Sequence, residues 1–200
     1  MSRAVKNTPK VLGLDISTKT IGWALFDIKS EELLELTHIS PRPKVKTQEK
    51  MLELLLKAEV FSSKLETYKN LGIVKVVIEE PLLNSNNIYT IQTLLRFNSF
   101  ISKEIYTILG IVPEFISTYN SRKFAWPGLV QPNDKGKYVL FGGLPKDVDK
   151  KMIVWEKVAK REPQITWAYT KNNTLKKECF DQTDAYTCVL GFMKSQEIWK

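Results

Sequence analysis

The sequence is poor in the residues that bind zinc and form disulfides. Its 200 residues include one histidine, His38, and two cysteines, Cys179 and Cys188. Structural zinc sites take four Cys or His ligands at short spacings, and two cysteines outside a CxxC pair build no disulfide framework. His38 is therefore interpreted as a strand or surface residue rather than a catalytic base, and the cysteine content favours an intracellular protein.

Long hydrophobic runs are also missing. No stretch approaches the roughly 20 apolar residues that span a membrane, and the N-terminal "MSRAVKNTPK" has no apolar core like that of a secretory signal. We therefore expect a soluble protein with no membrane partner. A basic N-terminal arm over residues 1–10 is expected to precede a single domain over residues 11–200.

Positive charge is what the sequence has in excess. Lys and Arg number 30 against 22 Asp and Glu, which gives a formal net charge of +8 and favours a polyanionic partner such as nucleic acid. The cations Arg122 and Lys123 lie next to the aromatic residues Phe124 and Trp126, a combination that suits phosphate contact with base stacking. For any single basic residue the simpler interpretation is a solvated surface, and Trp126 could equally pack in a small local core.

The apolar patterns predict an α/β fold with a mixed five-stranded sheet flanked by helices. Three antiparallel strands come first, and later strands arrive by helical crossovers. The expected strands are residues 11–16, 21–28, 32–39, 73–80 and 112–118, and the expected helices are residues 47–70, 88–109, 146–161 and 182–193. Residues 119–145, rich in Gly, Pro and Lys, are interpreted as an insertion with a hairpin around "PNDKGKYVLF".

The helix at 88–109 has an unusually wide apolar face. Its apolar residues cover about half of the circumference at roughly 100° per residue, which is more than one sheet contact requires. Either a third layer or a partner subunit could cover the excess. We expect Phe97 and Ile101 to face outward.

Four acids lie at the ends of these elements. Asp15 ends an apolar strand in "VLGLDISTKTIGWALFD", where the simplest interpretation is a turn cap. Glu79 and Glu80 end the run "IVKVVIEE", and strand alternation allows only one of them on a given face. Asp181 and Asp184 are three residues apart on one helical face, although Asp181 could instead be an N-cap.

Together the four acids fit a divalent cation site. Hard cations such as Mg²⁺ take oxygen ligands, and two ions about 4 Å apart can activate a water and stabilise the leaving oxygen in phosphodiester hydrolysis. Asp15, Glu79, Asp181 and Asp184 are the candidate catalytic and metal-binding residues, with Glu80 as second choice to Glu79. Two Mg²⁺ ions are the expected cofactor, with Mn²⁺ as the alternative.

The order and spacing of these motifs resemble the RuvC-type Holliday junction resolvases of the RNase H-like nuclease superfamily. "VLGLDISTKTIGWAL" resembles the family's first motif through Asp15, Gly22 and Trp23; "VVIEE" resembles the second through Glu79. "DQTDAYTCVLGF" resembles the DxxDA motif of the last helix, and "KDVDKKMIVWEKV" resembles the family's basic helix, with Lys150 as the nearest match to its lysine.

The sequence departs from the family pattern at three places, one of which is the extra acid Glu80 beside Glu79. Ser17 stands where the first turn usually has glycine, so that its hydroxyl could contact phosphate. Residues 119–145 are longer than the corresponding link of the bacterial enzymes, and phage, viral and organellar branches vary most there.

The resemblance implies a Mg²⁺-dependent, structure-selective endonuclease that cuts four-way or branched DNA as a homodimer. The expected DNA contacts are Ser17, Lys19, Arg122, Lys123, Lys146, Lys150 and Lys151. Two alternatives stay open: an RNase H-like nuclease that acts on RNA or on DNA without junction selectivity, and a non-catalytic nucleic-acid-binding protein of the same fold.

Overall fold

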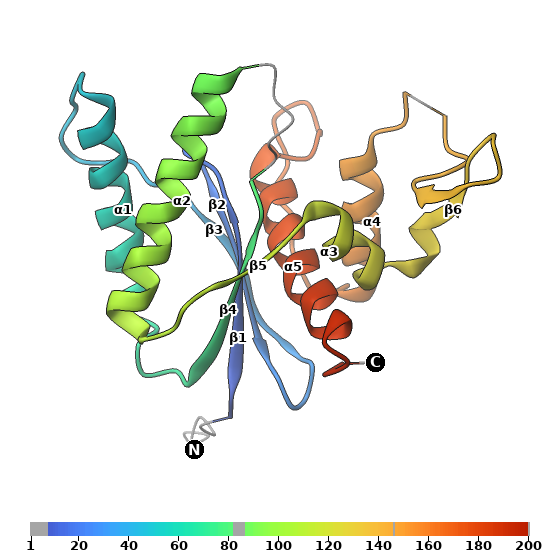
Figure 1. The fold of residues 1–200 in the computed structure, drawn as a ribbon, viewed down its shortest axis with the longest axis horizontal. Coiled ribbons are helices and arrows are strands. Elements are labelled where there is room, and N and C mark those ends of the chain that lie inside the picture. The colour runs from blue at the N-terminus through green and yellow to red at the C-terminus, as the bar shows by residue number, and fades with distance from the viewer. Residues whose placement is uncertain (1–7, 82–86, 146, 200) are drawn as a thin grey trace.

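A five-stranded sheet with helices on both faces forms the centre of the molecule (Figure 1). The computed structural model describes residues 8–81, 87–145 and 147–199, so most of the expected N-terminal arm and Lys146 lie outside the described residues. The strands are β1 (Lys10–Ile16), β2 (Ile21–Asp27), β3 (Leu33–Ile39), β4 (Ile73–Glu79) and β5 (Glu114–Ile116).

The sheet is mixed, as the sequence predicts. Its strand order is β3-β2-β1-β4-β5. The pairs β1–β2 and β2–β3 are antiparallel, whereas β4 joins β1, and β5 joins β4, in parallel. The parallel pairs follow from the helical connections, which return the chain to the same end of the sheet.

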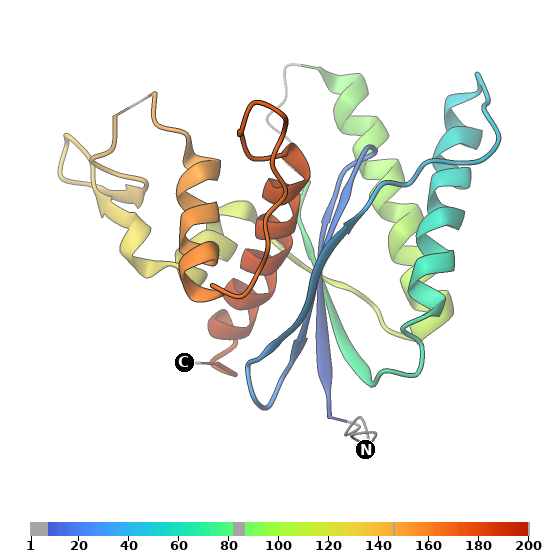
Figure 2. The ribbon, with the colours of Figure 1, turned by 180° about the vertical axis from the view of Figure 1, so that it is seen from behind.

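Helices cover the sheet in two layers, which Figure 2 shows from behind. α1 and α2 lie on one face; α5 lies on the other, with α3 and α4 packed against it (Figure 1). The helices are α1 (Lys50–Glu66), α2 (Ile88–Leu109), α3 (Thr118–Ala125), α4 (Lys150–Arg161) and α5 (Lys177–Ser195), with a short 3₁₀ turn at Pro127–Leu129. Among the described residues, no helix is both long and apolar enough to cross a bilayer.

Strand alternation divides the apolar core between the two faces. Leu14, Trp23 and Ile78 pack with Phe61 and Phe97 beneath α1 and α2. Neighbouring strand positions point the other way, where Val11, Ala24, Phe26 and Val77 pack against α5. Residues that follow Leu14 and Ile78 in their strands therefore face α5.

Several predicted boundaries are wrong. α1 is shorter than residues 47–70, and the strand expected at 112–118 is reduced to β5. α4 begins at Lys150 rather than 146 because the side chain of Asp149 caps it, accepting bonds from the N–H groups of Lys151 and Met152. α5 begins at Lys177 rather than 182, and no side-chain cap marks its start. Asp181 is therefore inside α5 and is not its N-cap.

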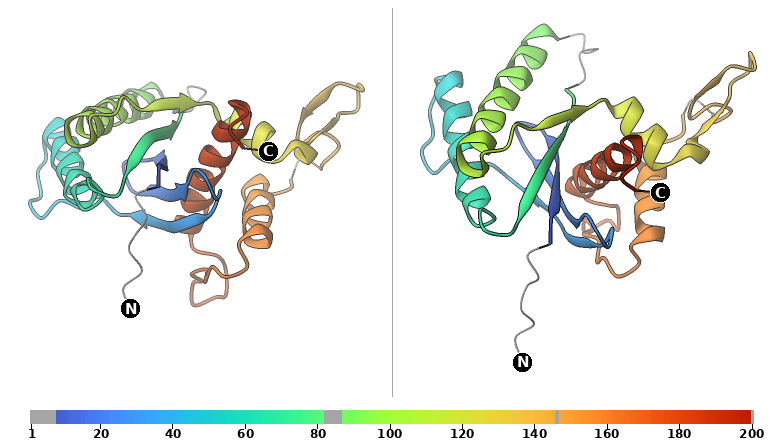
Figure 3. Two further views of the ribbon diagram at one scale, coloured as in Figure 1. Left: turned by 90° about the horizontal axis from the view of Figure 1, so that it is seen from below. Right: turned by 60° about the horizontal axis from the view of Figure 1, so that its bottom comes forward.

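The stretch 119–145 holds more structure than expected. The predicted hairpin is present as β6 (Val130–Pro132) and β7 (Tyr138–Leu140), and it projects beyond α3 and α4 (Figure 3). The sequence did not predict α3, which begins just before this stretch and packs closely on α5: a Cβ at Gly191 would lie 2.1 Å from the carbonyl oxygen of Ser121. The part nearest β5 is thus integrated with the helical layer.

The outward face of α2 differs from the prediction. Phe97 and Ile101 are completely buried against the sheet. The exposed apolar side chains of this helix include Ile88, Leu95 and Tyr106, with Leu95 42% exposed. Choosing Phe97 and Ile101 as the outward stripe was therefore wrong, because the helix presents them to the core.

Candidate metal centre

Asp15 and Glu79 lie side by side because β1 and β4 are adjacent and parallel. Leu14 is in register with Ile78, and the acids are the next residue of each strand. Since Leu14 and Ile78 pack under α1 and α2, both carboxylates point to the opposite face, toward α5. Glu80 follows the last residue of β4 and is exposed; it also lines the cleft at these acids but lies outside the group of close carboxylates.

α5 brings the third carboxylate. Asp184 is buried where α5 crosses β1 and β2. Asp15, Glu79 and Asp184 each offer a carboxylate oxygen, and these three atoms lie within 4.8 Å of one another. Three hard oxygen donors at this separation match the ligands that Mg²⁺ and Mn²⁺ prefer, so the residues present fit a divalent cation.

The acids line a cleft of about 340 Å³. Asp181 lines the same cleft but is outside the group of three close carboxylates. One turn before Asp184 on α5, it lies near His38 of β3, whose ring nitrogen contacts the amide of Gln182 at 3.1 Å. The four predicted acids therefore share one cleft, with three of them close enough to share one cation.

Two cations reach Asp184 from different helices. Arg122 of α3 donates to Oδ1 of Asp184 at 3.0 Å, and Nζ of Lys151 on α4 lies 3.4 Å from Oδ2. The guanidinium of Arg122 also lies 6.0 Å from the centre of the Phe141 ring. These contacts neutralise Asp184, and they place positive charge at the wall of the cleft.

Burial and mutual repulsion raise the pKa values of the acids. Burial raises the pKa of Asp15 well above its ordinary value, and the carboxylates of Glu79 and Asp184 raise it further. Burial, followed by repulsion from Asp184, raises the pKa of Glu79 to about 7. The pKa of Asp181 is raised, again mainly by burial. A cation between these oxygens would oppose all three effects, because it stabilises the ionised form.

Ser17, rather than Asp15, organises the first turn. Its hydroxyl oxygen accepts a bond from the N–H of Thr20 at 3.0 Å, and the hydroxyl donates to the Thr20 carbonyl at 2.8 Å. The interpretation of Asp15 as a turn cap is therefore not needed. Ser17 also lines the acidic cleft.

The other predicted DNA contacts divide into two groups. Arg122 and Lys151 are in the cleft. Lys150, chosen as the match to the family's lysine, instead lies 5.8 Å from the Phe141 ring, so Lys151 takes the position at the acids. Lys123 is exposed beside Phe124, and Lys19 is exposed on the first turn. Trp126 packs in the core, as its alternative interpretation has it: its ring lies parallel to that of Tyr186, with the ring centres 6.5 Å apart.

No pattern in the sequence indicated the pairing of Arg122 with Asp184. The two residues are 62 positions apart, and α3, which positions Arg122, was not predicted. Its position among cations and aromatic residues favoured Arg122 as a DNA contact, whereas its side chain is only 12% exposed.

Comparison with known proteins identifies the fold. No protein-family model and no curated protein sequence matches this chain. Solved structures do match: RuvC of Thermus thermophilus in complex with a Holliday junction substrate has a TM-score of 0.61 at 11% identity, over 94% of this chain and 95% of that chain. Another Thermus thermophilus RuvC structure gives 0.57 at 13% identity, over 94% and 96% of the two chains.

A eukaryotic structure matches in the same way. The yeast mitochondrial Holliday junction resolvase Ydc2 has a TM-score of 0.62 at 11% identity, over 96% of this chain and 80% of that chain. The chain thus has the RuvC-like form of the RNase H-like fold, which confirms the predicted fold class. At these identities the likeness concerns the fold alone.

Proposed function

We propose that the protein is a Mg²⁺-dependent endonuclease that cuts four-way or otherwise branched DNA. The observation that carries this proposal is the convergence of Asp15, Glu79 and Asp184 within 4.8 Å on a RuvC-like fold. Two of the matched proteins are named as a Holliday junction resolvase or as bound to a junction. The net charge of +8 supports a polyanionic substrate.

The carboxylates would hold the cations, with Asp181 as the fourth ligand. Bound Mg²⁺ supplies the charge that activates water and stabilises the leaving oxygen of a phosphodiester. No side chain of the cleft needs to form a covalent bond to the substrate. Mn²⁺ would fit the same donors.

Arg122 and Lys151 would orient the scissile phosphate. Both cations line the cleft beside the acids, and Arg122 donates to Asp184 through a terminal nitrogen of its guanidinium. A guanidinium can donate to Asp184 and to a phosphate oxygen at the same time. A phosphate contact from Ser17 would require its hydroxyl to release the carbonyl of Thr20, to which it donates.

A homodimer would supply two such sites. Resolving a four-way junction requires cuts in two strands, and one cluster of close carboxylates is present among the described residues of the chain. The exposed leucines of α1 and α2, Leu52, Leu55 and Leu95, are the proposed contact surface.

A cleavage assay tests the proposal. The full chain is incubated with labelled four-way junction, flap, linear duplex and RNA, with Mg²⁺ or with EDTA. We expect cutting of the junction only with Mg²⁺, and loss of cutting with retained binding in Asp15→Asn. Equal cutting of all DNA, or cutting of RNA alone, would establish one of the alternative nucleases; binding without cutting in any divalent cation would establish a non-catalytic protein.

Glu79 and Glu80 provide a matched pair of variants. Glu79→Gln removes a ligand of the cluster, whereas Glu80→Gln removes the adjacent exposed charge. We expect the first to lower the cleavage rate by more than tenfold, about 1.4 kcal/mol of barrier, and the second to stay within that limit. The opposite order would assign the ligand to Glu80.

A further inference from the structure

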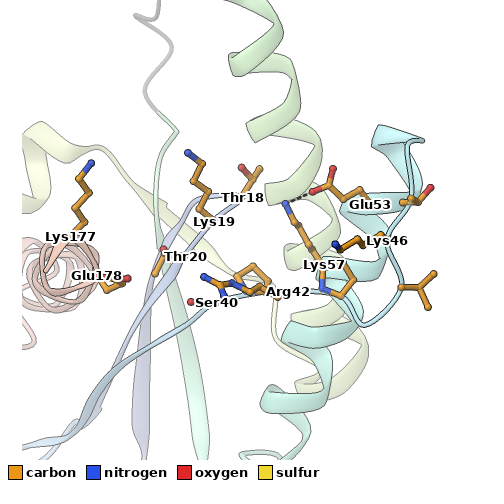
Figure 4. Close-up of a pocket in the computed structure, with 14 residues that line it drawn as sticks. Thr18, Lys19, Thr20, Ser40, Arg42, Lys46, Glu53, Lys57, Lys177 and Glu178 are labelled. Atoms are coloured by element: carbon orange, nitrogen blue, oxygen red, sulfur yellow. Dashed lines mark ion pairs between the residues drawn. The ribbon is translucent and has the colours of Figure 1, made fainter. Parts of the chain in front are cut away.

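A second concave site lies on the other side of the first turn. It encloses about 760 Å³ and is lined by the turn at residues 18–20, the loop at residues 40–47, the N-terminal half of α1 and the first turn of α5 (Figure 4). Four segments far apart in the sequence thus form its wall. None of the carboxylates of the candidate metal centre lines it.

The site carries an excess of positive charge. Lys19, Arg42, Lys46, Lys57 and Lys177 line it. Figure 4 shows them coming from all four segments, with Lys19 and Lys177 extending in the same direction.

Few carboxylates offset these cations. The acids in the lining are Glu53 and Glu178, and Glu53 already pairs with Lys57 at 2.6 Å. No other lining cation forms an ion pair within the described parts of the chain. Like charges gathered in this way repel one another unless an anion binds between them.

The remaining lining favours phosphate over a nucleobase. It includes the hydroxyl residues Thr18, Thr20, Ser40 and Thr47, which suit phosphate and sugar oxygens. The apolar contribution comes from two prolines and Val45, and no aromatic ring is present on which a base could stack. A site of this kind fits a backbone better than a free nucleotide.

The site is adjacent to the acidic cleft. Ser17 lines the cleft, and the next three residues line the second site. On α5, Lys177 and Glu178 are one turn before Asp181 of the cleft. A strand that crosses the cleft can therefore pass over the first turn into the second site.

We propose that this second site binds backbone phosphates of the DNA on one side of the phosphate that is cut, with Arg42 and Lys46 as its principal ligands. Lys19 and Lys177 extend the contact toward the cleft. The inference rests on the proposed function, since it assigns this anion site to the same DNA strand. Arg122 and Lys151 would hold the strand at the cleft itself.

Binding of a labelled junction in EDTA, in an Asp15→Asn background that cannot cut, tests the site. Arg42→Ala/Lys46→Ala is compared with Lys69→Ala/Lys103→Ala, which removes the same charge from exposed positions outside the lining. We expect the first pair to weaken binding at least tenfold and to lower the slope of log K against log salt by about 1.8, as the loss of two phosphate contacts requires. The second pair should change binding by less than about threefold.

A charge-conserving variant and melting curves check the fold. Arg42→Lys/Lys46→Arg should bind nearly as the parent, and the alanine variants should melt cooperatively. The proposed site would be overturned if both alanine pairs weakened junction binding equally, or if Arg42→Ala/Lys46→Ala left junction binding unchanged. Competition by a millimolar deoxynucleoside triphosphate that depends on Arg42 and Lys46 would overturn the backbone assignment in favour of a free nucleotide.

The results separate the two proposals. If the unmutated chain cuts the junction while Arg42→Ala/Lys46→Ala binds normally, the second site fails and the proposed function stands. If the unmutated chain cuts nothing while the same variant loses DNA binding, the proposed nuclease fails and the DNA site stands.

Discussion

Gly22 of β2 and Asp181 of α5 are in direct backbone contact: a Cβ at Gly22 would lie 1.9 Å from the carbonyl oxygen of Asp181. Gly22 is also the residue paired with Asp15 across the β1–β2 ladder. The missing side chain lets α5 approach the sheet at the point where Asp184 must reach Asp15. The glycine of the first motif thus determines the distance between acids from opposite ends of the chain.

Gly22→Ala should therefore affect both stability and the metal centre. The added methyl group must push α5 from the sheet, which we expect to lower the free energy of unfolding by about 1–3 kcal/mol and to reduce Mg²⁺-dependent cleavage. Urea unfolding and junction cleavage measure the two effects. Gly128→Ala is the control, because a Cβ there meets nothing within 4 Å. Unchanged stability in Gly22→Ala would show that the helix approach does not depend on this glycine.

Arg122→Met should destabilise the protein most when no divalent cation is present. The side chains of Arg122 and Asp184 are 12% and 8% exposed. Loss of one partner of a buried ion pair lowers the free energy of unfolding by roughly 3–5 kcal/mol. Because Lys151 still pairs with Asp184, we expect a loss at the lower end of this range. Urea unfolding in EDTA and in Mg²⁺ measures the difference in free energy of unfolding between the parent and the variant. We expect this difference to be smaller in Mg²⁺, because the bound cation then neutralises Asp184 in place of Arg122. Lys123→Met, on the exposed side of α3, should change stability by less than about 0.5 kcal/mol. A deficit that Mg²⁺ leaves unchanged would indicate that Arg122 acts only by packing on Phe141.

Mg²⁺ binding should strengthen as the pH rises. The pKa of Glu79 is raised to about 7, so near pH 6 only about a tenth of this group is ionised and the apparent Mg²⁺ affinity should be about tenfold weaker than near pH 8. Calorimetric titration at the two pH values measures this change. Glu79→Gln should reduce the dependence and leave the part that comes from Asp15, whose pKa is also raised. Equal affinity at both values in the parent would contradict the assignment of Glu79 as a ligand.

The same shift sets the direction of stability with pH in EDTA. The folded protein holds a proton on Glu79 that the unfolded chain releases near its ordinary pKa of 4.5. The contribution of the protonated Glu79 to the free energy of unfolding is therefore complete at low pH and is lost as the pH rises toward about 7. Chemical unfolding in EDTA across this pH range should show that the free energy of unfolding of the parent falls as the pH rises. The fall should be smaller in Glu79→Gln.

Charged substitutions at exposed leucines of α1 and α2 should separate the proposed dimer. Leu55 and Leu95 are each 42% exposed, so Leu55→Asp/Leu95→Asp should give a folded monomer that binds DNA and loses paired cutting. Leu34→Asp, at a 44% exposed position on β3, is the control. Sedimentation at micromolar concentration measures the state. A monomeric parent protein with full junction cutting would contradict the dimer and this surface together.

The sequence alone determined which strands bear the acids and which of the two adjacent glutamates joins the close carboxylates. Strand periodicity is local: alternation along "IVKVVIEE" separates Glu79 from Glu80, and the apolar run before Asp15 defines the strand that carries it. The order of strands and crossovers then restricts the sheet to few topologies. For this reason the mixed sheet and the common cleft of the four acids could be predicted.

Only the tertiary structure decided the distances and the partners. The start of α5 could not be read from a cap, since Lys176 makes no capping side-chain bond, and the helix is instead held by packing along both β1 and β2. Arg122 reaches Asp184 across 62 residues because α3 packs on α5 at Gly191. Such contacts depend on the shapes of surfaces that meet only after folding, as do the buried positions of Phe97 and Ile101 and the basic site beside the first turn.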